Sequence, residues 1–279
     1  MTKKIFFTDL DGTLLDDDKK IGAKTFKALE NFTNCGHILV LSSGRDINNL
    51  KNIKEKLKLD FPGLYLIGYN GGQIYDCGND KTLFKKTMEK EEAVKIIRIA
   101  NEMGIHCHTY SETHLLVPAG DQKAALYPKE FAYYRRSINT PVIYSHDLAS
   151  DIKEGPCKCI AINLEDQAKL EKLKAKIQKS FPDITAIFSC PVYLELLPAS
   201  SGKGAALKKL CEILNIPIAD SIAAGDQEND LSMLLSAGFS IAMRNGAESL
   251  KDIADIVTEN DNNHDGLADI FKAYPCTIK

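Results

Sequence analysis

Two aspartates separated by one residue lie near the start of the chain, directly after a short apolar segment. Asp9 and Asp11 are followed by Gly12 and Thr13, and residues 4–8 before them are expected to form a buried strand. In an open α/β sheet, ligands bind just beyond the carboxyl ends of the strands, and Gly12 allows a sharp turn there. Two carboxylates this close are costly unless a cation offsets their charge, and Mg²⁺ prefers oxygen ligands. The pair therefore predicts a magnesium site rather than a simple turn.

Two further loops carry groups that suit a phosphate. Ser43 and Gly44 follow a second apolar segment and open a predicted helix, where a hydroxyl and free amides favour an anion. Lys203 stands in the first turn of another predicted helix. The helix dipole disfavours a lysine at that position, and an anionic partner would relieve this. Taken alone, each loop also fits an ordinary helix start.

A fourth loop, at 225–230, follows a predicted strand at 221–224 and adds three acids and an amide. Asp226 lies nearest the strand and is the expected direct metal ligand. Asp230, one turn further on, could hold a metal-bound water or orient Lys203. Four such loops at strand ends are improbable together by accident, so the sequence predicts one composite site.

The elements that must hold these loops alternate between apolar strands and amphipathic helices. Strands are predicted at 4–8, 37–41 and 64–67, with helices at 23–32 and 47–57 between them, and the last third of the chain repeats this rhythm. Continuous apolar strands separated by helices are typical of a parallel sheet covered on both faces. We therefore expect an α/β fold with a Rossmann-like, doubly wound parallel-sheet core.

The rhythm changes in the middle of the chain. A helix at 91–103, a hairpin at 105–117 and a helix at 167–180 between two strands indicate a compact α+β unit. We expect residues 1–82 and 191–279 to form the core, and 83–190 to form an inserted domain.

Length and composition restrict the class of protein. A chain of 279 residues suits two domains at ~100–200 residues per domain. Hydrophobic content of 44% with 26% charged residues is typical of a globular protein with a sizeable core. A net charge of −3 gives no electrostatic reason to expect nucleic acid or an anionic membrane as a partner. No apolar run approaches the ~18 residues of a membrane span, and a cytoplasmic location is expected.

Eight cysteines are spread along the chain without a CxxC pair. A chain of this length can build a core without disulfides, so we expect reduced thiols.

The four loops, in this order, resemble the motifs of haloacid dehalogenase superfamily phosphatases, specifically the Cof-type branch with a large inserted cap. Residues 9–13 match the DxDGT motif, and Ser43 ends the second motif. Lys203 matches the lysine of the third motif, and residues 225–230 match the GDxxND motif. The matches span essentially the whole chain.

This resemblance implies roles for individual residues. Asp9 would be the nucleophile that forms an aspartyl-phosphate, and Asp11 the acid that protonates the leaving alcohol, which calls for a raised pKa. Mg²⁺ would be held by the Asp9 carboxylate, the Asp11 backbone carbonyl and Asp226. The phosphoryl oxygens would be bound by Ser43, Lys203, Asn229 and the backbone amides of Leu10 and Gly44. Asp230 and Asn70 would support the site.

The resemblance also implies the reaction. We expect a Mg²⁺-dependent phosphatase acting on small phosphorylated metabolites, sugar phosphates first, with the insert as a cap that selects the substrate. Two alternatives stay open: a phosphomutase or phosphotransferase of the same superfamily, and a catalytically weak metal-dependent binding or regulatory protein. In the insert, His106 and His108 share a strand face that is more readily a solvated or substrate-facing surface than a metal site. Glu195 receives no role, and the oligomeric state is left open.

Overall fold

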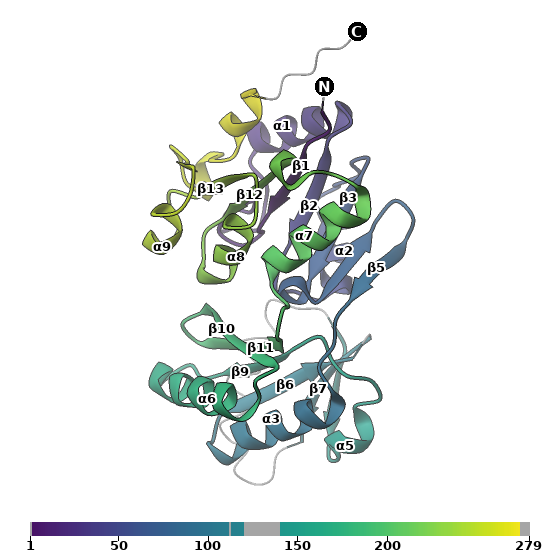
Figure 1. The fold of residues 1–279 in the computed structure, drawn as a ribbon, viewed down its shortest axis with the longest axis vertical. Coiled ribbons are helices and arrows are strands. Elements are labelled where there is room, and N and C mark those ends of the chain that lie inside the picture. The colour runs from purple at the N-terminus through teal and green to yellow at the C-terminus, as the bar shows by residue number, and fades with distance from the viewer. Residues whose placement is uncertain (1, 112, 120–139, 274–279) are drawn as a thin grey trace. The chain divides into compact units, whose positions relative to one another are not determined.

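The computed structural model describes residues 2–111, 113–119 and 140–273. The chain divides into two compact units (Figure 1). The first combines Met1–Phe84 with Gly202–Lys279, and the second is Lys85–Ser201.

The first unit is built on an eight-stranded sheet in the order β14-β13-β12-β1-β2-β3-β4-β5. The central pairs β12–β1, β1–β2 and β2–β3 are parallel, as are β13–β12 and β14–β13, whereas β3–β4 is antiparallel. The strands are β1 (Ile5–Thr8), β2 (Ile38–Ser42), β3 (Leu64–Gly68), β4 (Gln73–Asp76), β5 (Lys81–Lys85), β12 (Ser221–Gly225), β13 (Phe239–Ala242) and β14 (Ile256–Val257).

Both faces of this sheet are covered, because neighbouring residues of β1 point to opposite faces and both are fully buried. Phe7 packs in the cluster that contains Leu207 of α7 (Lys203–Leu214), whereas the ring of Phe6 contacts Phe32 of α1 (Ala23–Asn34) and Phe271. The helices of this unit are α1 (Ala23–Asn34), α2 (Ile47–Lys56), α7 (Lys203–Leu214), α8 (Leu231–Leu234) and α9 (Glu248–Lys251). The predicted doubly wound α/β core is confirmed.

The second unit is a six-stranded sheet in the order β10-β11-β9-β6-β7-β8, packed against α3 (Lys90–Glu102) and α6 (Gln167–Ser180). The remaining elements are β6 (His106–Tyr110), β7 (Leu115–Pro118), β8 (Val142–Ser145), β9 (Cys159–Ile162), β10 (Ile184–Cys190), β11 (Tyr193–Pro198) and α5 (Leu148–Asp151). Apolar side chains of the two long helices and of one sheet face form a single core.

The insert ends later in the chain than 190. A boundary there would assign β11 to the core, but β11 pairs antiparallel with both β10 and β9 in the second unit. Leu194 and Leu196 fill the core of that unit. An apolar strand at 193–198 suits either sheet by its sequence, and only its pairing decides between them.

Two expectations from composition can be compared with the fold. Within the described part of the chain, no helix is both long and apolar enough to cross a bilayer. Cys35 is disulfide-bonded, so the expectation of reduced thiols is wrong for this residue. The free cysteines are Cys77, Cys107, Cys157, Cys159, Cys190 and Cys211.

Candidate active site

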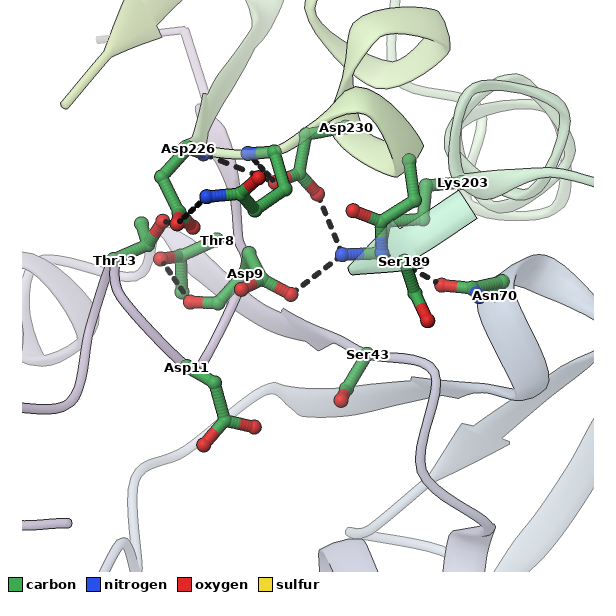
Figure 2. A network of polar contacts seen from close by, with 12 residues as sticks. Thr8, Asp9, Asp11, Thr13, Ser43, Asn70, Ser189, Lys203, Asp226 and Asp230 are labelled. Atoms are coloured by element: carbon green, nitrogen blue, oxygen red, sulfur yellow. Dashed lines mark hydrogen bonds and ion pairs between the residues drawn. The ribbon is translucent and has the colours of Figure 1, made fainter. Parts of the chain in front are cut away.

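A buried lysine joins two of the predicted acids. The Nζ atom of Lys203, at the start of α7, lies 2.5 Å from Asp9 Oδ1 and 2.5 Å from Asp230 Oδ1. Lys203 and Asp230 are 0% exposed and Asp9 is 7% exposed. Figure 2 shows these side chains turned toward one another. The structure thus brings together residues that lie 194 and 27 positions apart in the sequence.

The loop after β12 is held by its own hydrogen bonds. Asp230 Oδ2 accepts from the backbone N–H groups of Asp226 (3.0 Å) and Gln227 (3.2 Å). Asp226 accepts from the Thr13 hydroxyl at 2.7 Å and from the Gln227 amide at 3.2 Å. Both oxygens of Asp230 are therefore engaged, and this residue orients Lys203 and the loop.

Gly12 allows the first and fourth loops to meet. Its φ is +86°, and a Cβ atom built there would lie 2.4 Å from Asp226 Oδ2. Any side chain at this position would displace the carboxylate of Asp226 and would also strain the backbone.

Charge is incompletely balanced in this cluster. Burial raises the pKa of Asp9 well above its ordinary value, and the nearby Asp230 and Asp226 raise it further against the opposing charge of Lys203. Burial and the charge of Asp230 raise the pKa of Asp226 to about 6. Burial alone would lower the pKa of Lys203, but Asp230 and Asp9 raise it on balance. The lysine thus stays protonated, and the carboxylates lack positive charge.

This donor set fits a hard divalent cation. Among the described residues, Asp9, Asp226 and Asp230 each offer a carboxylate oxygen, and these atoms lie within 4.8 Å of one another. Mg²⁺ takes oxygen ligands, and a cation would relieve the repulsion that raises the pKa of Asp9 and of Asp226. Asp230 accepts from the charged Lys203 and from two backbone amides. Asp226 accepts from two neutral side chains, and Asp9 accepts from Lys203 through Oδ1. Asp9 and Asp226 are therefore the better candidates for metal ligands.

The loops after β2 and β3 meet beside this cluster. The backbone N–H of Asn70 donates to the carbonyl of Ser43 (3.0 Å), and the amide of Asn229 donates to Asn70 Oδ1 (3.1 Å). Asn70 adopts φ 52°, a left-handed conformation that asparagine tolerates well. A Cβ at Gly44 would lie 3.2 Å from Asn70 Nδ2, so Gly44 permits this close approach.

One donor in these loops has no partner. Asn70 is fully buried, and its Nδ2 forms no hydrogen bond within the described ranges. A buried donor without an acceptor is costly, and an anionic ligand oxygen would satisfy it. Of the remaining predicted site residues, Leu10 directly follows Asp9, and the hydroxyl of Ser43 accepts from the N–H of Arg45 (3.3 Å).

The environment of Asp11 differs from the sequence-based expectation. Its two carboxylate oxygens accept from Nε and Nη2 of Arg45, both at 3.0 Å, and Lys19 Nζ lies 2.8 Å away. Burial alone would raise the pKa of Asp11, but the charges and hydrogen bonds of Arg45 and Lys19 outweigh it, so this pKa is lowered. The expectation of a raised pKa is therefore wrong for Asp11 in this state. Sequence reasoning missed Arg45 as its partner, although the arginine directly follows Gly44.

Comparisons with known proteins cover nearly the whole chain. A family model described as haloacid dehalogenase-like hydrolase matches residues 6–271. The chain is 30% identical to 5-amino-6-(5-phospho-D-ribitylamino)uracil phosphatase YwtE of Bacillus subtilis, over 95% of this chain and 96% of that protein. It is 27% identical to phosphatase YwpJ of the same organism, over 96% and 99% respectively. Among solved structures, a haloacid dehalogenase-like hydrolase from Bacteroides thetaiotaomicron matches with a TM-score of 0.83 and 26% identity, covering 98% of this chain and 99% of that chain.

Gly12→Ala tests the convergence of the first and fourth loops. We expect Mg²⁺ affinity, measured by isothermal titration calorimetry, to fall by about tenfold or more, as for changes that displace a metal ligand. Gly36→Ala is the matched control, because Gly36 also has positive φ (+82°) but no atom within 4 Å of a built Cβ. Equal Mg²⁺ affinity in wild type and Gly12→Ala would contradict the placement of Asp226 in the metal site.

Proposed function

The chain belongs to the haloacid dehalogenase-like hydrolase family and is a phosphatase, and we propose that it hydrolyses small phosphorylated metabolites by a Mg²⁺-dependent aspartyl-phosphate mechanism. The family and the Cof-type branch predicted from the four motifs are confirmed. The observation that carries the proposal is the buried contact of Lys203 with Asp9 and Asp230, beside Asp226.

Asp9 is the nucleophile in this proposal. Its carboxylate attacks phosphorus, the bond to the leaving oxygen breaks, and the phosphoryl group is carried on Asp9 until water releases it. The ammonium of Lys203 contacts the carboxylate of Asp9 and opposes the rise in its pKa, and the bound cation would lower that pKa further. The equatorial phosphoryl oxygens are bound by hydrogen-bond donors, which stabilises the charge that develops on them. These donors are the side chains of Ser43, Lys203, Asn229 and Asn70 and the backbone amides of Leu10 and Gly44.

Asp9, Asp226 and the backbone carbonyl of Asp11 would hold Mg²⁺. When bound, the ion supplies positive charge that neutralises the carboxylates and the phosphoryl oxygens. The donor chemistry of the cluster and the raised pKa of Asp226 support this assignment.

Asp11 is the general acid and base of the proposed reaction. It must carry a proton to hand to the leaving oxygen, whereas Arg45 and Lys19 favour its ionised form. The acid role therefore requires that a bound substrate draws at least one of these cations away from Asp11. An anionic phosphate monoester is suited to do so.

Sugar phosphates and phosphorylated polyols are the proposed substrates. The relative YwtE is named for a substrate whose phosphate is carried on a ribityl chain, which is a linear polyol. We assign the choice of substrate to the second unit, Lys85–Ser201, as a cap.

Asp9→Asn tests the nucleophile. We expect phosphate release from sugar, nucleotide and cofactor monophosphates to fall by at least about a thousandfold, as when a nucleophile is removed. Phosphate release should also cease when a chelator replaces Mg²⁺. Asp18→Asn is the matched control, because Asp18 is an exposed acid close by in the sequence. Isomerisation of a sugar phosphate without phosphate release would favour a mutase instead, and no turnover of any substrate would favour a binding protein.

Arg45→Gln tests the control of Asp11. Removing the guanidinium raises the pKa of Asp11, so the proton needed for catalysis is retained to higher pH. We expect the alkaline limb of the profile of kcat/KM against pH to shift upward by about one pH unit or more. Arg45→Lys keeps a positive charge and should shift the limb less. A limb that stays in place or moves to lower pH would contradict the role of Asp11 as the acid.

A further inference from the structure

The loop after β13 contacts both loops of the proposed metal site. Asn245 donates from its side-chain Nδ2 to the carbonyl of Gly12 at 2.7 Å. Two residues later, the backbone N–H of Ala247 donates to the carbonyl of Asp226 at 2.8 Å. The first and fourth loops are therefore tied to the same short segment of backbone, 243–247.

This segment lies so close to Asp226 that it leaves no room for a side chain at position 246. A Cβ atom built on Gly246 would lie 3.1 Å from the Cα atom of Asp226 and 2.9 Å from the carbonyl oxygen of Met243. The N–H of Gly246 donates to that carbonyl, and the N–H of Met243 donates to the carbonyl of Gly225. Asn245 thus extends from a backbone that is held against the fourth loop.

Asn262 holds the amide of Asn245 from the other side. The backbone N–H of Asn262 donates to Asn245 Oδ1 at 3.2 Å, and Asn262 Nδ2 donates to the carbonyl of Leu15 at 2.9 Å. Asn262 is buried, whereas Asn245 is exposed. Two carbonyls of the first loop, those of Gly12 and Leu15, therefore accept from two asparagines that are joined to each other.

The peptide group that Asn245 holds lies between two groups of the metal site. Before it comes the carbonyl of Asp11, a proposed ligand, and after it comes Thr13, whose hydroxyl donates to Asp226 Oδ1 at 2.7 Å. Glycine has more backbone freedom than other residues, and Gly12 adopts φ +86°. The hydrogen bond to the Gly12 carbonyl restricts rotations that would move the Asp11 carbonyl relative to Asp226.

Folding stability is a weak explanation for this contact. The hydrogen bond between Asn245 and Gly12 lies at the surface, where water can replace either partner, so its net contribution to stability is small. The contact is better explained by the groups that it holds in place.

We propose that Asn245, oriented by the N–H of Asn262, is a positioning residue that fixes the Asp11 carbonyl relative to Asp226 and thereby favours Mg²⁺ over larger divalent cations. This inference rests on the proposed metal site and adds a residue that contacts neither the metal nor the substrate. Mg²⁺ demands nearly ideal octahedral geometry, whereas Ca²⁺ accepts a flexible one. Loss of the hydrogen bond should therefore weaken the binding of Mg²⁺ more than that of Ca²⁺.

Isothermal titration calorimetry of the whole chain with Mg²⁺ and with Ca²⁺ tests this inference. We expect Asn245→Ala to weaken Mg²⁺ binding by about tenfold, as for groups that orient metal ligands, and Ca²⁺ binding by less. Asn245→Asp keeps an acceptor for the Asn262 N–H but cannot donate to Gly12. Its added charge attracts both divalent ions, so the ratio of the two dissociation constants should change as it does in Asn245→Ala.

Asn263→Ala is the matched control. Asn263 Oδ1 accepts from the backbone N–H of Asp17 at 3.0 Å, and its Nδ2 donates to Asp17 Oδ2 at 3.3 Å. It therefore holds the same N-terminal segment, but beyond residues 12–15. Both metal affinities should stay at their wild-type values in this variant.

The outcomes separate this inference from the proposed function. If wild type binds Mg²⁺ and folded Asn245→Ala binds it equally well, the inference is wrong and the metal site stands. An equal loss of Mg²⁺ and Ca²⁺ affinity also contradicts the inference, because it indicates a general weakening of the site and not a lost geometric constraint. If wild type binds no Mg²⁺, the proposed Mg²⁺-dependent function fails, and the inference fails with it.

Discussion

The site depends on a buried ammonium shared by two carboxylates. Lys203 has no exposed surface and contacts Asp9 and Asp230 at 2.5 Å each. A buried charge is tolerated only when its partners are held in place. This requirement ties the end of β1, the loop after β12 and the start of α7 to one another. The close approach at Gly12 and the hydrogen bonds of Asp230 follow from it.

The same cluster is left short of positive charge. Asp9, Asp226 and Asp230 face one buried lysine, and the second cationic pair, Arg45 and Lys19, is engaged by Asp11. Burial raises the pKa of Asp9 and of Asp226, and the uncompensated negative charge of their neighbours raises both further. A site with this excess of negative charge favours binding of a divalent cation. A bound cation would then offset the repulsion between the carboxylates and a phosphate group. We regard the incomplete compensation as the source of the proposed chemistry.

Sequence reasoning predicted the core and the convergence of its loops because both follow from general geometry. Parallel strands bring their carboxyl ends to one edge, so Asp9, Ser43 and Asp226 had to lie near one another. It could not predict the pairing of Asp11 with Arg45, 34 positions away, because side-chain direction decides it. The sign of the Asp11 pKa shift depends on that pairing. The boundary of the insert was misplaced for a related reason. An apolar pattern predicts that a strand forms, but it does not predict which strand it pairs with.

Both units bury a lysine beside carboxylate groups, but the charges balance in only one of them. In the second unit the charges of Lys158 and Glu195 cancel each other. These residues lie 37 positions apart in the sequence, and no sequence pattern predicts that they pair. Complete compensation leaves no net charge on this pair. Incomplete compensation around Lys203 leaves net charge, which suits a metal and a phosphate.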